Sequence, residues 1–579
     1  SIIKNMEEDC KNEKYEQFDT MDIEDEEKDH RHKKKNAKKY FLYPNKIIKL
    51  LFLSVSLLCI LFLLYHYLNN ESNNIMPGSL EHKNEGNQLE VTLPKKCEIG
   101  YKLVDNACVI NHSIKAIYFT KEDNERIKLI SYMMNFPMEM IIDGEYVGIC
   151  KEHTFPKAGN HTVYILSDFS KMTSAKRMFY QIKQLQSLTF TPLFDTRNVK
   201  TMKSMFYECV ALTSIDLSYF NTEKVKSMEL MFAGCHKLTS INLSHFNTKS
   251  VTTLANMFED CMELAQLDLS GFNTEQVTDM SFMFFGCASL TSIDLSHFIT
   301  DEVTTMEYMF KGCLSLTSIN ISNFNTENVS SLSRMFERCT SLISLDLSRF
   351  NTKHATSISS MFFDCFKLRS VNLKSFNTEN VIAMNGLFHG CESLTSLEIN
   401  HFKTKNVINM NLMFNGCKSL TSLDISNFNT DSLQYIDSIF QDCSSLRSIN
   451  VKHFKTDKIT SMISIFQGCS SLTSIDLSNF DTSNVVNMKH MFYECRSLTS
   501  VDLSNFNVKK VTRMEYMFYK CTDLNFIDIS TFDFQNIKII SLFNNLPDKG
   551  YIRIQDVLYQ RIKEQIPQEW DISINDELV

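Results

Sequence analysis

Glycine and proline are scarce in this chain of 579 residues, which contains 15 and 8 of them. Collagen-like and long low-complexity chains need far more of both, so these two classes are excluded for most of the length. Positive charge is not in excess either, because the formal net charge is -9. This balance argues against a general nucleic-acid binder. The 43% of apolar residues is ample for a packed core.

Motifs of common enzyme classes are absent as well. The sequence has no nucleophile elbow, no glycine-rich phosphate-binding loop and no zinc-protease helix motif. Only residues 111–168 carry neither repeats nor a hydrophobic run, and this stretch is small for an enzyme. We therefore expect no catalysis, no cofactor and no metal. A hydrolytic or transfer activity within residues 111–168 is the alternative.

One hydrophobic run predicts a membrane anchor. The stretch "LFLSVSLLCILFLLYHYL", residues 51–68, contains no acidic side chain, lysine or arginine. Its length is close to the ~20 residues that a helix needs to cross a bilayer. The basic block "RHKKKNAKK" precedes it, and positive charge stays on the cytoplasmic side. We expect a single-pass type II membrane protein. A cleaved signal peptide is the alternative, although the run lies deep in the chain and lacks a small-x-small cleavage site.

Composition divides the chain into seven predicted segments. They are a disordered cytoplasmic tail (1–46), a transmembrane signal-anchor helix (47–68), a flexible stalk (69–95), a small disulfide loop (96–110), a β-rich capping unit (111–168), a repeat region (169–546) and a C-terminal strand and helix cap (547–579). Cys97 and Cys108 are expected to pair if the compartment is oxidising. Their segment resembles the closing half of an EGF-like module, and Cys150 is left over. In the capping unit, Asp143-Gly144 between two apolar runs predicts a hairpin.

A repeat of constant length occupies most of the chain. Cysteine recurs every 26 residues at positions 209, 235, 261, 287, 313, 339, 365, 391, 417, 443, 469, 495 and 521. One phenylalanine stands three residues before each of these thirteen cysteines, and another stands eleven residues after it. No insertion or deletion interrupts the units. Constant length is what a stack of similar turns requires.

The unit 303–328, "VTTMEYMFKGCLSLTSINISNFNTEN", shows the expected local structure. In "VTTMEYMF" the apolar residues are spaced as on one face of a two-turn helix, and in "LTSINI" they are spaced as in a short strand. Because helices pack roughly 8–10 Å apart and strands about 4.8 Å apart, the stack is expected to curve with its strands on the inside.

The pattern L-x-x-L-x-L after a helix resembles the leucine-rich repeat. The form "MF-x-x-C-x-SLTSIDLSNFNT" resembles the 26-residue BspA-like repeats of bacterial and protist surface proteins, over about residues 169–546. The resemblance implies an α/β solenoid, a curved leucine-rich repeat stack, and adhesion or host contact as its function. Where ordinary leucine-rich repeats carry asparagine, this chain has Phe220, Phe246 and their equivalents. An aromatic stack is therefore expected to hold the return loop.

Two columns of the repeat could carry chemistry, a column being the residues at one position of successive units. The cysteine column cannot pair completely because thirteen is odd, and a straight column cannot converge on a metal. Cysteine is expected there as a small buried residue. The second column is polar: Asp216, Asn242, Asp268, Asp294, Asn320, Asp346, Asn372, Glu398, Asp424, Asn450, Asp476, Asp502 and Asp528.

The polar column has three interpretations. It is a hydrogen-bonded ladder that keeps the sheet soluble, a recognition surface for a basic protein or a polar glycan, or a weak calcium site that lacks enough oxygen ligands. For the second, the binding residues are Asp216, Asp268, Asp294, Asp346, Asp424, Asp476 and Asp502. Glycosylation is predicted at Asn111, Asn160 and Asn328. Sequons also fall at Asn242 and Asn320, where a sugar would obstruct this surface.

These observations lead to one leading hypothesis. The chain is a type II membrane-anchored surface protein whose concave strand face binds a protein or glycan, on a host or neighbouring cell, through many shallow polar contacts. Nucleic acid is not expected as a partner. The alternative is a structural spacer or coat component that associates with copies of itself and has no specific ligand.

Overall fold

The computed structural model describes residues 101–104, 107–110, 112–131, 137–532 and 541–575, all of them within the compact unit Leu93–Val579. The predicted tail, membrane span, stalk, Cys97 and the sequon at Asn111 lie outside the described residues. Among the residues that are described, none belongs to a helix with the length and apolarity needed to cross a membrane.

Strands dominate the regular structure. Those before the repeats are β1 (Tyr101–Val104), β2 (Ala107–Ile110), β3 (Ile114–Thr120), β4 (Glu125–Lys128), β5 (Glu139–Ile142), β6 (Glu145–Ile149), β7 (Glu152–Phe155) and β8 (Gly159–Leu166). Those of the repeats are β9 (Leu185–Phe190), β10 (Ser214–Asp216), β11 (Ser292–Asp294), β12 (Ser318–Asn320), β13 (Ser344–Asp346), β14 (Ser370–Asn372), β15 (Ser500–Asp502) and β16 (Phe526–Ile529). The chain continues with β17 (Lys549–Gln555), helix α4 (Asp556–Ile562), the 3-10 helix η1 (Lys563–Gln565) and β18 (Glu569–Asn575).

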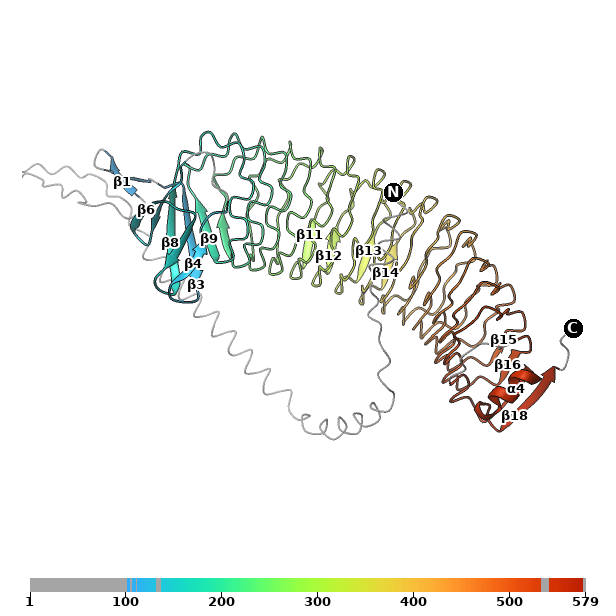
Figure 1. Ribbon diagram of the computed structural model, residues 1–579. Coiled ribbons are helices and arrows are strands. Elements are labelled where there is room, and N and C mark those ends of the chain that lie inside the picture. Colours follow the sequence, from blue (N-terminus) through green and yellow to red (C-terminus); the bar gives the residue numbers. More distant parts are fainter. Residues whose placement is uncertain (1–100, 105–106, 111, 132–136, 533–540, 576–579) are drawn as a thin grey trace, which may run out of the picture. The chain divides into compact units, whose positions relative to one another are not determined.

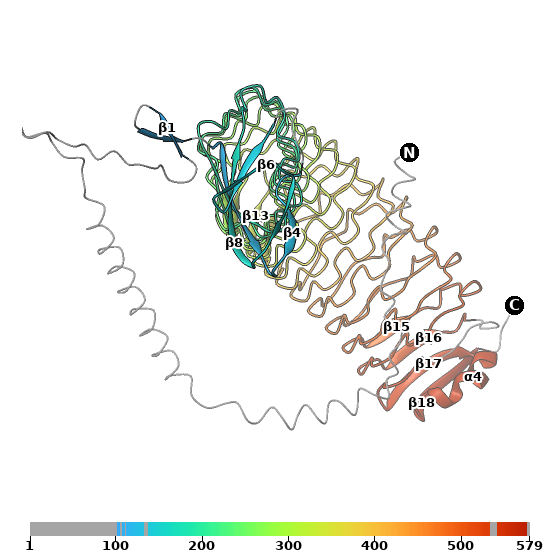
Figure 2. The same cartoon turned by 60° about the vertical axis from the view of Figure 1, so that its left-hand side comes forward.

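The β-rich unit caps the first repeat by extending its sheet. The strand order is β10-β9-β3-β8-β5-β6, with β10 parallel to β9 and β3 antiparallel to both β9 and β8. β4 and β7 pair separately. The hairpin predicted at Asp143-Gly144 joins β5 to β6, and both residues have positive φ, 47° and 94°, as in the tight turns that suit hairpins. Figures 1 and 2 show this unit at one end of the stacked turns.

The repeats form the predicted solenoid of stacked turns, and eight of these turns carry a short strand, β9 to β16. The strand predicted in every unit is thus present in part, since units such as those of Asp268 and Asp424 have no strand at that position. In the middle of the stack β11 pairs with β12 and β13 pairs with β14, each in register with its equivalent one unit later. A second line of parallel bridges runs beside the strands, for example Thr305 to Ser331. These backbone bonds between turns hold the solenoid together.

The prediction of a short helix in every unit is wrong. In the described part of the chain the helices are α4 and η1, both after the repeats. Where the helix was expected, residues such as Tyr308 and Gly312 have φ of 58° and 77°, which a right-handed helix cannot contain. Their neighbours bond to the next turn instead, as the Phe310 amide does to the Met335 carbonyl at 2.9 Å. The segment therefore folds as two tight turns joined by a ladder.

The loss of the helix removes the expected cause of curvature. In the inner phenylalanine column, which stands three residues before each cysteine, the centroids of neighbouring rings lie 5.3–6.0 Å apart. In the outer column, which belongs to the return loop, Phe220 and Phe246 lie 6.3 Å apart and Phe376 and Phe402 lie 6.5 Å apart. Successive turns are thus spaced more widely at the return loop than in the segment that was expected to be helical.

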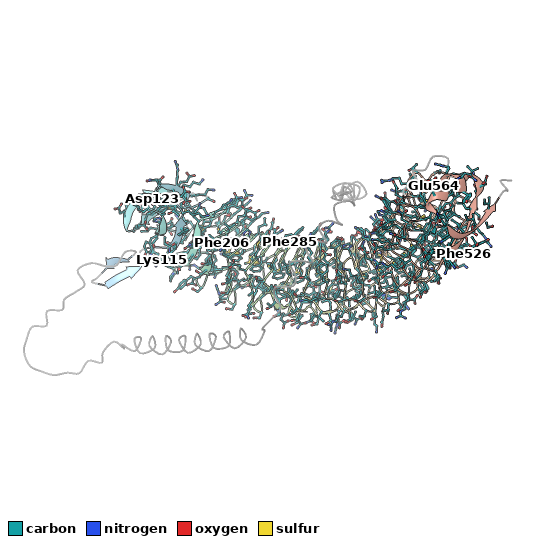
Figure 3. The ribbon with its side chains drawn as sticks, turned by 90° about the horizontal axis from the view of Figure 1, so that it is seen from below. Lys115, Asp123, Phe206, Phe285, Phe526 and Glu564 are labelled. Atoms are coloured by element: carbon teal, nitrogen blue, oxygen red, sulfur yellow. The ribbon has the colours of Figure 1, made fainter. Side chains whose placement is uncertain are left out.

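The core is a set of buried columns. In the unit that starts at residue 303, Val303, Met306, Met309, Phe310 and Cys313 are each 0% exposed. Figure 3 shows the side chains along the stack and labels Phe206 of the inner column. The degenerate first and last turns join the same column, since Phe179 stacks on Phe206 and Phe543 on Phe518, each pair 5.8 Å apart.

Candidate binding face of the solenoid

The strand face is the surface formed by the polar column and the serine column two residues before it. All seven predicted binding residues, Asp216, Asp268, Asp294, Asp346, Asp424, Asp476 and Asp502, are exposed on it. Asp216, Asp294, Asp346 and Asp502 end the strands β10, β11, β13 and β15, whereas Asp268, Asp424 and Asp476 occupy the same position of turns without a strand. In each turn the alternation of the extended segment turns the polar residues outward while the residue between them faces the core. The residues that were predicted to share one surface therefore do share it.

Each of these aspartates also closes a tight turn with the residues that follow it. Oδ1 of Asp268 accepts a hydrogen bond from the Ser270 amide at 2.9 Å, and Oδ1 of Asp346 accepts one from the Ser348 amide at 3.0 Å. Asparagine does the same where it occupies the column, as in Asn242, which accepts from the Ser244 amide at 3.1 Å. This Asx turn explains why Asp and Asn recur here, since the side-chain oxygen of both can reach the amide two residues on. Glu398, with a longer side chain, has no such bond among those that the structure describes.

Most of these carboxylates have no cationic partner. Lys452 pairs with Asp476 at 3.0 Å, and Arg553 pairs with Asp528 at 3.3 Å. Within the described ranges, no ion pair involves Asp216, Asp268, Asp294, Asp346, Asp424 or Asp502. The amide and hydroxyl of the serine two residues on lower the pKa of Asp268, Asp294 and Asp346. Hydrogen bonds from Ser478 and Lys452 lower the pKa of Asp476 to about 2. These four side chains are thus ionised at neutral pH.

The face is open rather than hollowed. A shallow depression over β13 and β14 is lined on its polar side by Ser344, Asp346, Ser370, Asn372 and Glu398. The register places Asp346 beside Asn372, and Asp294 beside Asn320 on β11 and β12. At these two places an amide beside an acid relieves the repulsion that two neighbouring carboxylates would feel, whereas Asp502 lies directly beside Asp528 on β15 and β16. Such a surface suits an extended partner, not a small molecule enclosed in a pocket.

The cysteine column has a role beyond filling space. All thirteen of its thiols are free and buried, as expected. Each also donates a hydrogen bond to a phenylalanine carbonyl of the preceding turn, for example Cys313 Sγ to Phe284 O at 3.2 Å. The same carbonyl accepts the amide of its own turn's cysteine, Cys287, at 3.1 Å. The thiol therefore satisfies the second lone pair of a buried carbonyl. This role requires a protonated thiol, and sequence spacing did not reveal it.

A threonine ladder holds the return loop together with the outer phenylalanine column. Oγ1 of Thr274 donates to the Ile299 carbonyl at 2.7 Å and accepts the Ile299 amide at 2.9 Å. Equivalent threonines, such as Thr222 and Thr248, bond in the same way to Asn247 and Asn273. Threonine thus performs the bonding between turns that we expected to be replaced by aromatic stacking alone. Its recurrence in "FNT" was the signal for this role.

The capping unit contains a Thr-His-Asp arrangement. His161 Nδ1 lies 2.7 Å from Asp143 Oδ2, and His161 Nε2 lies 3.0 Å from Thr120 Oγ1. This order resembles a nucleophile, a base and an orienting acid. However, Thr120 is 0% exposed and its hydroxyl also donates to the Lys157 carbonyl at 3.3 Å. A substrate cannot reach this hydroxyl, so the arrangement joins the Asp143-Gly144 hairpin to β3 and β8.

Two of the three predicted glycosylation residues lie in the described part of the chain. Asn160 and Asn328 are exposed, and the Asn328 amide donates to the Asp301 carbonyl at 2.7 Å. The glycosylation of both stays a prediction. In the described part of the chain, no group of three or more His, Cys, Asp or Glu side chains is arranged to hold a metal.

The comparisons with known proteins place the repeats in a family. No curated protein matches the chain. A solved structure described as the crystal structure of the TLR13–ssRNA13 complex aligns with 66% of this chain and 81% of its own, at 14% identity and a TM-score of 0.14. The family model described as "Mycoplasma protein of unknown function, DUF285" matches residues 173–291, 262–370, 356–449 and 446–548. These matches cover more than half of the sequence, and the chain belongs to the DUF285 family.

Proposed function

We propose that the solenoid binds a macromolecular partner through its strand face and makes no covalent change to it. One observation carries this proposal: a row of exposed carboxylates that Asx turns hold in place, six of which, all except Asp476, have no cationic partner among the described residues. The charge favours the basic surface of another protein over a glycan. Binding through many shallow contacts would depend on the rigidity of the stack, because little entropy is lost when fixed side chains meet a partner.

The predicted setting of this function is a cell surface. The hydrophobic run at 51–68 and the basic block before it motivate a type II membrane anchor, and the BspA-like form of the repeat motivates adhesion. Both belong to the proposal. Protease treatment of intact cells tests the anchor, since the solenoid should be removed while the N-terminal tail is protected. Protection of the solenoid, or its loss together with the tail, would refute this topology.

The binding face is tested by removing charge while keeping the fold. Asp268→Asn, Asp294→Asn and Asp346→Asn combined remove three carboxylates and retain the Asx turn, as Asn242 and Asn320 do in the same column. We expect the affinity of the full chain for immobilised poly-lysine of about 20 residues to fall at least about tenfold, since steering and contact both depend on local potential.

A matched control distinguishes the loss of charge on the strand face from a change in the net charge of the protein. Glu223, Glu275 and Glu327 are exposed carboxylates of the return loop, and their change to glutamine alters the net charge by the same amount. We expect this triple variant to weaken binding by no more than about twofold. Equal losses in both variants would show an effect of net charge alone, and no loss in either would refute the strand face as the binding surface. Unchanged poly-lysine binding together with lost capture of a glycan on an array would assign the face to glycans.

A structural spacer is the second candidate. It is favoured by the Asx turns, which give the column a role in folding that needs no ligand. Under this alternative the aspartate-to-asparagine triple variant would keep every function of the protein.

A further inference from the structure

We propose that β18 is the contact between two copies of this chain, paired edge to edge in antiparallel register about a twofold axis centred on Ile572. This inference goes beyond the proposed function, because it concerns the end of the stack and not its strand face. It rests on the open edge of the last sheet, on the apolar side chains left uncovered there, and on the sequence of β18.

In the last sheet that the structure describes, β18 is an edge strand. The strand order is β15-β16-β17-β18, so β18 uses one edge to bond β17 and, among the described residues, has no partner on the other. Figure 1 shows β18 and α4 at the opposite end of the described unit from β6. Natural proteins usually protect such an edge with lysine, proline, glycine bulges or short length. The seven residues "EWDISIN" contain no lysine, proline or glycine, and their charged residues are the two acids Glu569 and Asp571.

The apolar side of β18 is only partly covered. In register, Ile572 lies beside Ile552 and Ile574 beside Ile554. The two isoleucines of β17 are 0% exposed, whereas Ile572 and Ile574 are 37% and 39% exposed. Trp570, on the same side of β18, is buried and rests on Gly550, where a Cβ would lie 2.6 Å from the ring. The core of the last turn therefore remains open at Ile572 and Ile574, and another strand at this edge would cover it.

The sequence of β18 is complementary to itself when reversed. With the axis at Ile572, that residue meets its own copy, Trp570 meets Ile574, and Asp571 meets Ser573. All seven residues overlap, apolar side chains share one side, and no carboxylate faces another. With the axis at Asp571, the two Asp571 carboxylates would lie opposite each other. With the axis between Asp571 and Ile572, polar side chains would lie opposite apolar ones. A closed pair is also the commonest symmetry for identical chains.

The oligomeric state of the full chain in mild detergent tests the proposal. Mass photometry should find a dimer whose dissociation constant rises at least about 100-fold in Ile572→Lys, because two ammonium groups would then meet on the axis. Ile343→Lys is the matched control, since Ile343 is 48% exposed on the body of the solenoid, and it should leave the dimer intact. A monomer at tens of micromolar, or a dimer that Ile572→Lys does not weaken, would overturn the pairing. Open-ended oligomers would also overturn it, because they require unlike edges such as β18 and β6 to meet.

A second variant keeps the test decisive if Ile572→Lys fails to fold. Ile572→Cys is close in polarity to the native residue and places two thiols opposite each other on the axis. Mild oxidation should cross-link this variant to a covalent dimer, at a rate at least about tenfold above that of Ser573→Cys, whose thiol would face Asp571. Equal cross-linking of the two variants, or none in either, would contradict the register.

Discussion

The Cys235 thiol donates a hydrogen bond to the carbonyl oxygen of Phe206, 3.3 Å away on the preceding turn. Twelve equivalent bonds repeat this contact at the other cysteines, from Cys209 to Cys521, at 3.0–3.3 Å. If filling space were the only requirement, alanine would serve equally well at this position. The hydrogen-bonded carbonyl explains why the position is always cysteine.

The thiols should make the protein sensitive to alkali. Burial raises the pKa of Cys209, Cys443 and Cys521 to about 12, and it raises that of the other columnar thiols as well. The folded state thus keeps protons that the unfolded chain releases near pH 9. Stability should be fully present below about pH 9 and fall between about pH 9 and 12, by about 1.4 kcal/mol per pH unit for each thiol that titrates.

Denaturant unfolding followed from pH 7 to 11 measures this loss. The triple variant Cys209→Ala, Cys443→Ala and Cys521→Ala should lose less unfolding free energy per pH unit than the native protein. It should also be less stable than the native protein at pH 7. At pH 8 a thiol reagent should leave the columnar cysteines of the native protein unmodified. Rapid native reaction of these cysteines, or a slope that the triple variant does not change, would contradict their role.

The threonine ladder should be sensitive to loss of one oxygen atom. Thr274→Val keeps the shape of the side chain but leaves the Ile299 amide and carbonyl without their partner, at a cost of about 2–4 kcal/mol in the free energy of unfolding. Thr274→Ser keeps the hydroxyl and should cost less than half as much. Thr278→Val is the control: Thr278 is exposed, and the Thr252 carbonyl to which it donates also accepts the Thr278 amide. Similar losses for Thr274→Val and Thr278→Val would argue against the ladder.

Left-handed backbone positions should tolerate glycine better than their native residues. Arg338 has φ of 59° and is exposed, so Arg338→Gly should raise the free energy of unfolding by about 0.5–1 kcal/mol. Ser341→Gly, at a nearby position without positive φ, should lower it by up to a similar amount. Thermal unfolding of both variants checks the sign. Destabilisation by Arg338→Gly would mean that its side chain contributes more than the backbone strain costs.

Binding through the strand face should persist at mildly acidic pH. The pKa of Asp268, Asp294, Asp346 and Asp424 is lowered, and that of Asp476 falls to about 2, so these carboxylates stay ionised well below neutrality. Poly-lysine affinity measured at constant ionic strength should change by less than about twofold between pH 5 and 8. A transition near pH 6 would assign the binding to histidine instead.

Much of the fold could be predicted because the repeat is strictly periodic. The strand in "TSINI", the buried cysteine column, the outward aspartates and the Asp143-Gly144 hairpin all follow from local pattern, and the structure contains each of them. The helix was predicted wrongly because apolar residues at 303, 306, 309 and 310 fit a helical face and a ladder of tight turns equally well. Leu230, Phe282 and Tyr308 give no hint in their side chains of a positive φ.

The sequence alone determined that turns of one length stack, which residues they bury, and which polar column faces solvent, because period and polarity are properties of the chain itself. Only the tertiary structure decided that the segment before each cysteine is a ladder, that thiol and threonine oxygen bond across turns, and that β18 has a strand partner on one edge among the described residues. Each of these depends on groups about 26 residues apart, where backbone bonds to a neighbouring turn outweigh local helix propensity.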